Sequence, residues 1–263
     1  SRFLPKSEAI SLLRQALAED PENPAFRFAL TSQLMDDPAS QEEAFQQLAV
    51  LREMAPQNAL VHYMDAQTRF AAGDYAGGLS VLDTAAKLNV GTVYAVENAQ
   101  NHSAALQAAG IDAELANTVA AFYAGTDEYE TVSQLRTGLM EYGAGFEAAG
   151  DYETALALYK SVEEMGQQVS RGAAYTNEYL VGLDTQMEAI EAMTGLAEQV
   201  EISDGQQEIQ QAYEIFLEGL DIFAEYANLL SSITKIDDIE ALMEAVKGIL
   251  QIGDIQYLQS LLM

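Results

Sequence analysis

Apolar residues recur at helical spacing along nearly the whole chain. Leu139, Tyr142 and Phe146 stand three and four positions apart, and Ala155 and Tyr159 continue this spacing in the next segment. Such intervals place the side chains on one face of an α-helix. The chain offers no convincing strand, because no segment carries the regular alternation of apolar and polar residues that a half-buried strand shows. The pattern therefore predicts an all-α protein.

The pentapeptide Ala-Ala-Gly-Asp-Tyr occurs twice, at residues 71–75 and 148–152, and each copy separates two amphipathic segments. Glycine supplies the backbone freedom for a tight turn, aspartate caps the following helix, and tyrosine packs between the two helices. Reuse of one turn indicates a repeated helix-turn-helix unit. We therefore expect helical hairpins that stack on one another.

Residues 139–165 carry, in order, a large apolar residue, a large residue beside a small one, an aromatic residue, the Gly-x-Tyr turn and an alanine on the second helix. This order resembles the tetratricopeptide repeat (TPR). Residues 30–56 fit a full repeat with one extra residue, residues 96–125 fit a degenerate repeat, and residues 9–21 fit a second helix alone. The resemblance covers residues 7–169 and implies a TPR-like right-handed α-solenoid of helix-turn-helix repeats.

The repeat turns and the positions of close helix packing share glycine, alanine or tyrosine. These positions are Gly73, Tyr75, Gly110, Gly143, Gly150, Tyr152 and Ala155. Gly143 is small where a neighbouring helix approaches, and Gly110 belongs to the degenerate repeat that we expect between the two pentapeptide copies in the stack. The repeat at 59–72 has His62 and Asp65 where the family has large apolar residues.

Beyond residue 171 the repeat pattern gives way to long helices. Residues 173–200 predict one helix without an internal turn, which breaks at 203–205. A second long helix follows through residues 209–230, and two shorter amphipathic helices close the chain, one after Asp237-Asp238 and one from Asp254. We therefore divide the chain into a TPR-like superhelix, residues 1–171, and a C-terminal helical hairpin with capping helices, residues 172–263.

A heptad seam occupies the second long helix. Its apolar residues alternate spacings of four and three, and they are Ile209, Tyr213, Phe216, Leu220, Phe223, Ala227 and Leu230. Either this helix packs on residues 173–200 as an antiparallel hairpin that caps the solenoid, or it pairs with a second molecule as a homodimer.

The resemblance implies that partner peptides lie in a concave groove lined by the first helix of each repeat. The expected groove residues are Phe28, Met35, Leu60, Tyr63, Gln67, Phe70, Met140 and Glu147. Tyr63 and Phe70 are the strongest candidates for partner contacts. The lysine and asparagine clamp by which one TPR subtype holds a carboxylate terminus has no counterpart at these positions.

Composition narrows the chemistry. The chain has no cysteine and two histidines, so thiolate sites and three-histidine zinc sites are excluded, and we expect no metal, no cofactor and no enzymatic activity. The formal net charge of −29 disfavours nucleic acid and anionic lipid and permits basic or apolar partners. The chain contains no run of 18 apolar residues, the length at which a helix can span a bilayer.

The sequence therefore favours a non-enzymatic protein-protein interaction or scaffolding module that binds a partner peptide in an apolar groove with an acidic rim. Two alternatives stay open: a structural protein that oligomerises through its C-terminal helices, and a small-ligand-binding protein of a bacterial envelope. The chain begins at Ser1 without methionine, which tilts the expected localisation towards export, although the compartment stays open.

Overall fold

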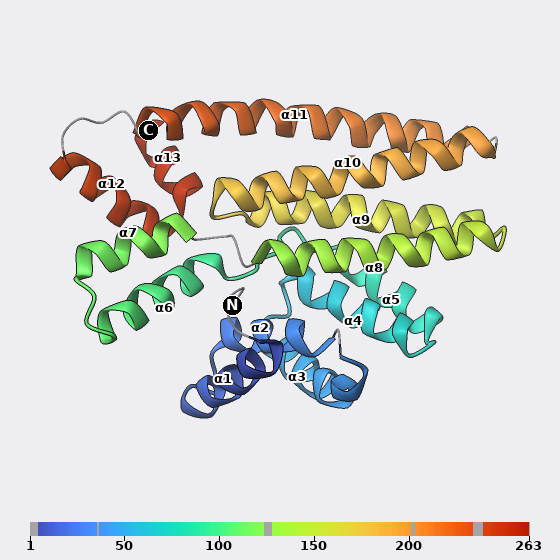
Figure 1. Ribbon diagram of the computed structural model, residues 1–263. Coiled ribbons are helices and arrows are strands. Elements are labelled where there is room, and N and C mark those ends of the chain that lie inside the picture. Colours follow the sequence, from blue (N-terminus) through green and yellow to red (C-terminus); the bar gives the residue numbers. More distant parts are fainter. Residues whose placement is uncertain (1–4, 36, 124–127, 201–202, 234–238, 263) are drawn as a thin grey trace.

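Every regular element in the described part of the protein is helical. The computed structural model describes residues 5–35, 37–123, 128–200, 203–233 and 239–262, and within them it contains helices α1 to α13, one 3-10 turn and no strand (Figure 1). The predicted all-α class is confirmed.

The helices are α1 (Lys6–Glu19), α2 (Pro24–Met35), η1 (Pro38–Ser40), α3 (Gln41–Met54), α4 (Ala59–Ala71), α5 (Tyr75–Ala85), α6 (Ala95–Ala108), α7 (Ala113–Tyr123), α8 (Glu128–Ala148), α9 (Tyr152–Gly172), α10 (Thr176–Gln199), α11 (Ser203–Ile233), α12 (Ile239–Ile252) and α13 (Asp254–Leu262). The helices that precede Pro21 and Pro56 end before those residues, as expected for a ring without a backbone N–H.

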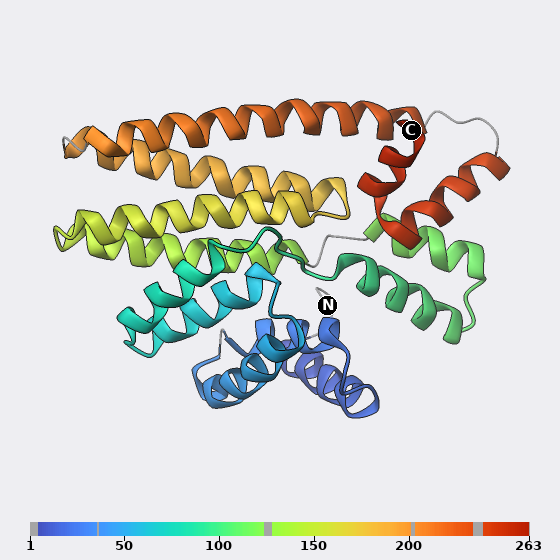
Figure 2. The same ribbon diagram turned by 180° about the vertical axis from the view of Figure 1, so that it is seen from behind.

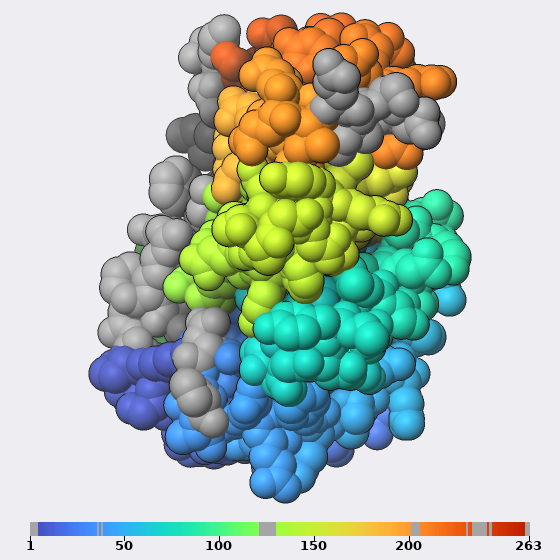
Figure 3. All heavy atoms as spheres, turned by 90° about the vertical axis from the view of Figure 1, so that its right-hand side faces the viewer, coloured from blue at the N-terminus to red at the C-terminus, as the bar shows by residue number. Residues whose placement is uncertain are grey.

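Helices pack on their neighbours in an ascending stack. The sequence of contacts runs α1–α2–α3–α4–α5, then from α4 to α8 and α9, and on through α10 to α11 (Figures 1 and 2). Seen from the side, the N-terminal helices lie at one end of the stack and α11 at the other (Figure 3). The second long helix thus packs on α10, as the hairpin alternative predicts.

The two pentapeptide hairpins, α4–α5 and α8–α9, are direct neighbours. The rings of Phe70 and Tyr142 lie 5.1 Å apart, and those of Tyr75 and Phe146 meet edge to face at 5.6 Å. Aromatic pairs at these separations contribute favourable contacts beyond the burial of area. Apolar side chains near the end of one hairpin therefore join it to the next.

The hairpin α6–α7 does not lie between them. It packs on α12, and it stands beside the stack at the lower left of Figure 1. The expectation that residues 96–125 form the intervening repeat of the array is wrong. The two helices and the turn at Gly110 are present, but the long connection after α5 carries this hairpin past α8 and α9.

The turns of the two pentapeptides have the same geometry. Gly73 and Gly150 both adopt φ = 79°, a region that favours glycine, and Gly110 adopts φ = 88°. The N–H of Asp74 donates to the carbonyl of Arg69 at 2.9 Å, closing a Schellman turn. The Asp74 carboxylate then caps α5 by accepting from the N–H of Gly77, and Asp151 caps α9 in the same way. The predicted turn roles of glycine and aspartate are confirmed.

The packing roles differ between residues. A Cβ at Gly143 would lie 2.4 Å from the ring of Tyr159, so glycine admits the neighbouring helix as predicted. Ala155 is buried. Tyr75 and Tyr152 are partly exposed, at 47% and 36%, so these tyrosines lie at the surface edge of their hairpins rather than deep between the helices.

The core crosses the border that the sequence suggests at residue 171. The main cluster of buried apolar side chains runs from Ala25 in α2 to Leu250 in α12, and it includes Val181 and Ala189 of α10. Helices α9 and α10 form the most extensive pair, and their backbones approach at Gly166. The helices on the two sides of residue 171 therefore share one packed interior.

Candidate functional site

Four of the expected groove residues lie inside the core. Phe28, Leu60, Tyr63 and Phe70 are at most 3% exposed. All four belong to the main cluster of buried apolar side chains, so the prediction that these four residues line an open groove is wrong. Their place in the first helices of the hairpins brings them to the interfaces between neighbouring hairpins.

An extended segment of the chain itself, residues 88–94, covers part of this region. Asn58 holds it, because its side-chain nitrogen donates to the carbonyl of Thr92 at 2.8 Å and its oxygen accepts from the N–H of Thr92 at 3.0 Å. Tyr94 then packs edge to face on Phe28, with ring centroids 5.6 Å apart. The segment occupies space that the sequence analysis left to a partner.

The other predicted groove residues are half-buried. Met35 and Met140 pack against the main core. Gln67 donates to the carbonyl of Gln134 in α8 at 3.5 Å, and Glu147 accepts a hydrogen bond from the Tyr159 hydroxyl at 2.8 Å. These contacts lie within or between the hairpins, so the eight residues do not form one accessible surface.

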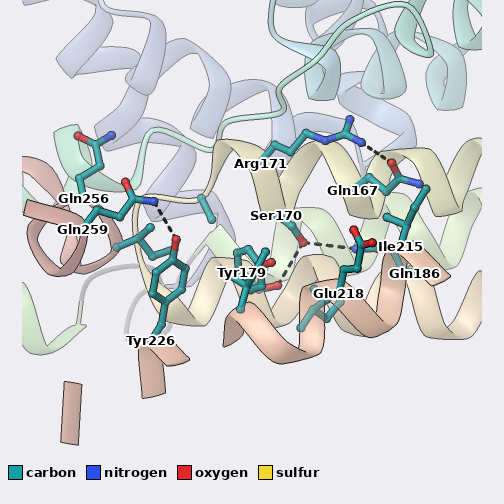
Figure 4. Close-up of a pocket in the computed structure, with 15 residues that line it drawn as sticks. Gln167, Ser170, Arg171, Tyr179, Gln186, Ile215, Glu218, Tyr226, Gln256 and Gln259 are labelled. Atoms are coloured by element: carbon teal, nitrogen blue, oxygen red, sulfur yellow. Dashed lines mark hydrogen bonds between the residues drawn. The ribbon is translucent and has the colours of Figure 1, made fainter. Parts of the chain in front are cut away.

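An open concave region of the described surface lies elsewhere, between α9 and α11. Two cavities adjoin there, one of about 500 Å³ and one of about 360 Å³. Gln167, Arg171 and Ile215 belong to the walls of both, so the two cavities form one continuous cleft. We call it the α9–α11 cleft, and Figure 4 shows its larger cavity.

The larger cavity has a polar wall around Gln186. The Gln186 amide nitrogen donates to the Gly182 carbonyl at 3.3 Å and to the Ser170 hydroxyl at 3.4 Å, whereas its buried oxygen has no hydrogen-bond partner among the described residues. Arg171 and Glu218 reach the same cavity from α9 and α11 (Figure 4). An unpaired buried acceptor is costly, so it marks a point where a ligand donor would be stabilising.

The smaller cavity contains two carboxyl groups with altered titration. Burial raises the pKa of Glu163 above its ordinary value, and burial also raises the pKa of Glu164. The amide nitrogen of Gln167 donates to Glu163 at 2.7 Å, while Lys160 bridges to Glu208 of α11 at 2.9 Å. This end of the cleft is therefore rich in acceptors and carries carboxyl groups that protonate readily.

These carboxyl groups make stability depend on pH. Because the folded-state pKa is raised, the contribution of the protonated Glu163 is fully present below the ordinary glutamate value of about 4.3 and is lost as pH rises through the folded pKa. We expect the urea midpoint of unfolding to fall across this window, and Glu163→Gln to flatten that fall. Exposed Glu153 on the same helix gives the control, since Glu153→Gln removes the same charge. Parallel pH profiles for the two variants would contradict the assignment.

A second feature lies on the outer side of α11. Tyr213, Leu217 and Leu220 are 43%, 44% and 38% exposed, and their spacing of four and three aligns them on one face of the helix. Exposed Ala224 and Ala227 continue this line, which we call the outer stripe. The helix therefore has two apolar faces, and the predicted seam mixes them.

The face that packs on α10 has a different phase from the predicted seam. Ala212, Phe216 and Tyr226 are its buried members, with Ile209 and Phe223 packed beside them. The predicted seam therefore contains residues of the face that packs on α10, such as Phe216 and Phe223. It also includes residues of the outer stripe, which lie on a different face.

The residues that the structure describes contain no cluster of three or more histidine, aspartate or glutamate side chains able to hold a metal ion. His62 lies 3.1 Å from the Pro56 carbonyl, and Asp65 accepts from Arg52 at 2.7 Å and from Arg69 at 3.0 Å. Both residues thus have structural partners.

Comparison of the chain with known protein families and with curated proteins found no match. Among the described helices, none combines the length with the apolar character that crossing a bilayer demands. The assignment of the α9–α11 cleft and the outer stripe as candidate sites therefore depends on the structure alone. The sequence analysis missed Gln186 and Arg171, because a single glutamine or arginine within a helical segment belongs to no recognisable motif.

Proposed function

We propose that this protein is a non-enzymatic binding module that docks a basic amphipathic helix on the outer stripe of α11. One observation carries the proposal: an apolar heptad line lies uncovered on the helix at the end of the stack. Exposed apolar surface rimmed by polar groups is typical of protein interaction sites. Helices presented in this way commonly bind a second amphipathic helix.

The charge around the stripe selects the partner. Glu214, Asp221 and Glu225 are exposed on α11, and residues 203–233 contain no lysine or arginine. A second α11 would bring the same carboxylates together, whereas a helix carrying lysine or arginine beside its apolar residues would meet them with opposite charge. Charge complementarity therefore favours a basic partner over a second copy of the chain.

The TPR-like right-handed solenoid belongs to this proposal as its scaffold. The matching turns at Gly73 and Gly150, and the direct packing of the two hairpins that contain them, support a repeat origin for this part of the stack. In such a scaffold no further repeat is stacked on the outer side of the terminal helix. Its outer face is then available for a partner.

A synthetic amphipathic helix of leucine and lysine at heptad spacing tests the proposal by fluorescence anisotropy. We expect it to bind the parent protein, to bind more weakly as salt is added, and to lose at least about tenfold in affinity to a Leu217→Ser, Leu220→Ser double variant. Val50→Ser, at a position 40% exposed on α3, is the matched control and should leave the affinity unchanged. The same helix with glutamate in place of lysine should not bind.

Two outcomes would overturn the basic-helix proposal. One is equal affinity of the probe for the parent and for the double variant, which would place the probe elsewhere. The other is a parent dimer in sedimentation that the Leu217→Ser, Leu220→Ser variant converts to monomer, which would show that a second copy covers the stripe.

A further inference from the structure

We propose that the larger cavity of the α9–α11 cleft is a binding site for a free α-amino acid with an apolar side chain. The proposal does not depend on the outer stripe, because the cavity opens beside the opposite flank of α11. Its volume of about 500 Å³ lies within the range of small-molecule sites, about 300–1,000 Å³. The walls divide into an apolar part and a polar part.

The apolar part is built around two tyrosines. The rings of Tyr179 and Tyr226 stand edge to face with centroids 5.9 Å apart, and Leu183 and Ile255 join them in the wall. Gly219 lets α11 pack closely on this wall, because a Cβ there would lie 2.7 Å from a methyl carbon of Leu183. An aliphatic or aromatic side chain of a ligand would find apolar contacts on this wall.

The polar part presents an acceptor that the protein leaves unpaired. Gln186 is 2% exposed, and its oxygen lacks a partner while its nitrogen is held by the Gly182 carbonyl and the Ser170 hydroxyl. The bond to the Gly182 carbonyl sets the orientation of the amide, because a carbonyl accepts only from the nitrogen, whereas the Ser170 hydroxyl can pair with either end. The group that satisfies the Gln186 oxygen must be a donor, such as a ligand ammonium.

Two opposite charges complete the complementarity. Arg171 comes from α9 and donates to Gln167, and Glu218 comes from α11; within the described residues neither forms a salt bridge (Figure 4). A cavity with one cation and one anion on separate walls matches a zwitterion better than it matches a net charge. The ligand carboxylate would face the Arg171 guanidinium, and the ligand ammonium would face Glu218 and the Gln186 oxygen.

Isothermal titration calorimetry of the full chain with L-leucine and L-phenylalanine tests this assignment. We expect at least one of them to bind with a negative heat-capacity change, because apolar surface is buried. Leucinamide lacks the carboxylate and 4-methylpentanoate lacks the ammonium, and each should bind at least about tenfold more weakly than leucine. Absence of binding by both amino acids, or equal binding of leucine and its two analogues, would overturn the proposal.

Variants locate the site. Glu218→Gln should weaken leucine binding at least about tenfold, whereas Glu225→Gln, on an exposed position of the same helix that does not line the cavity, should leave it unchanged. Gln186→Met keeps the side-chain length and removes the acceptor, and it should weaken binding in a protein whose thermal unfolding confirms folding. Equal affinities of the Glu218 and Glu225 variants would contradict the assignment. Leucine binding should survive Leu217→Ser, Leu220→Ser, which separates this result from the docking of a helix.

Discussion

Phe70→Ala is expected to lower the free energy of unfolding by about 3–5 kcal/mol, the usual cost of truncating a buried phenylalanine. The ring is buried between the two pentapeptide hairpins, where it contacts Tyr142 and Tyr75. It also lies against Gly78, where a Cβ would come within 2.4 Å of the ring. Alanine would leave a cavity at this position. The neighbouring side chains cannot fill it, because the helices that carry them are held in place by their other contacts. Urea unfolding followed by circular dichroism measures the change.

Tyr63 provides the companion test. Its hydroxyl is buried and has no hydrogen-bond partner in the described part of the chain, and the pKa of Tyr63 is raised well above its ordinary value, first because of burial. Tyr63→Phe should therefore leave stability unchanged or slightly increased, because phenylalanine removes an unpaired polar group and keeps the ring. Tyr63→Ala should behave like Phe70→Ala. Alanine variants as stable as the parent would restore these residues as candidates for partner contact.

Gly182→Ala is expected to cost about 3 kcal/mol, at the upper end of the usual range for overpacking. A Cβ at Gly182 would lie 2.6 Å from the carbonyl oxygen of Gly166 and 2.7 Å from the backbone nitrogen of Ser170. Backbone atoms within a helix cannot move aside as a flexible side chain can. The change would therefore push α9 and α10 apart. This separation would loosen the shared core and displace the wall of the cleft.

Gly195 is the matched control for this change. It lies in the same helix, and a Cβ there would meet nothing within 4 Å. Gly195→Ala should therefore leave stability unchanged or raise it by up to about 1 kcal/mol, because alanine favours the helix over glycine. Thermal unfolding of the two variants under one condition gives the comparison. An equal effect of the two substitutions would contradict the close approach of the two backbones.

Local features of the fold were predictable because their causes are local. The Gly-Asp-Tyr turns follow from the freedom of glycine at positive φ and from the short reach of aspartate to the N–H groups of the next turn. The helix ends before Pro21 and Pro56 follow from the missing N–H of proline. Gly143 was assigned correctly because two helices can approach closely only where a small residue stands at the contact.

The candidate site was much less predictable. Both cavities arise where α9 and α11 pass each other across α10, and their polar residues come from positions spread between Asn89 and Gln259. Gln186 stands out only once its oxygen is seen to lack a partner. The outer stripe was visible as apolar spacing, but periodicity could not distinguish Leu220 on the outer face from Phe216 on the buried one.

The sequence by itself determined the helices, their turns and the two matching hairpins, since helical periodicity and capping act over a few residues and need no distant partner. Tertiary structure alone decided that Phe70 and Tyr63 are buried, that residues 88–94 cover part of the expected groove, and that α6–α7 packs on α12. The physical reason is that an apolar face specifies burial without specifying its partner. The connection lengths and the fit of neighbouring helices choose among the surfaces that could cover it.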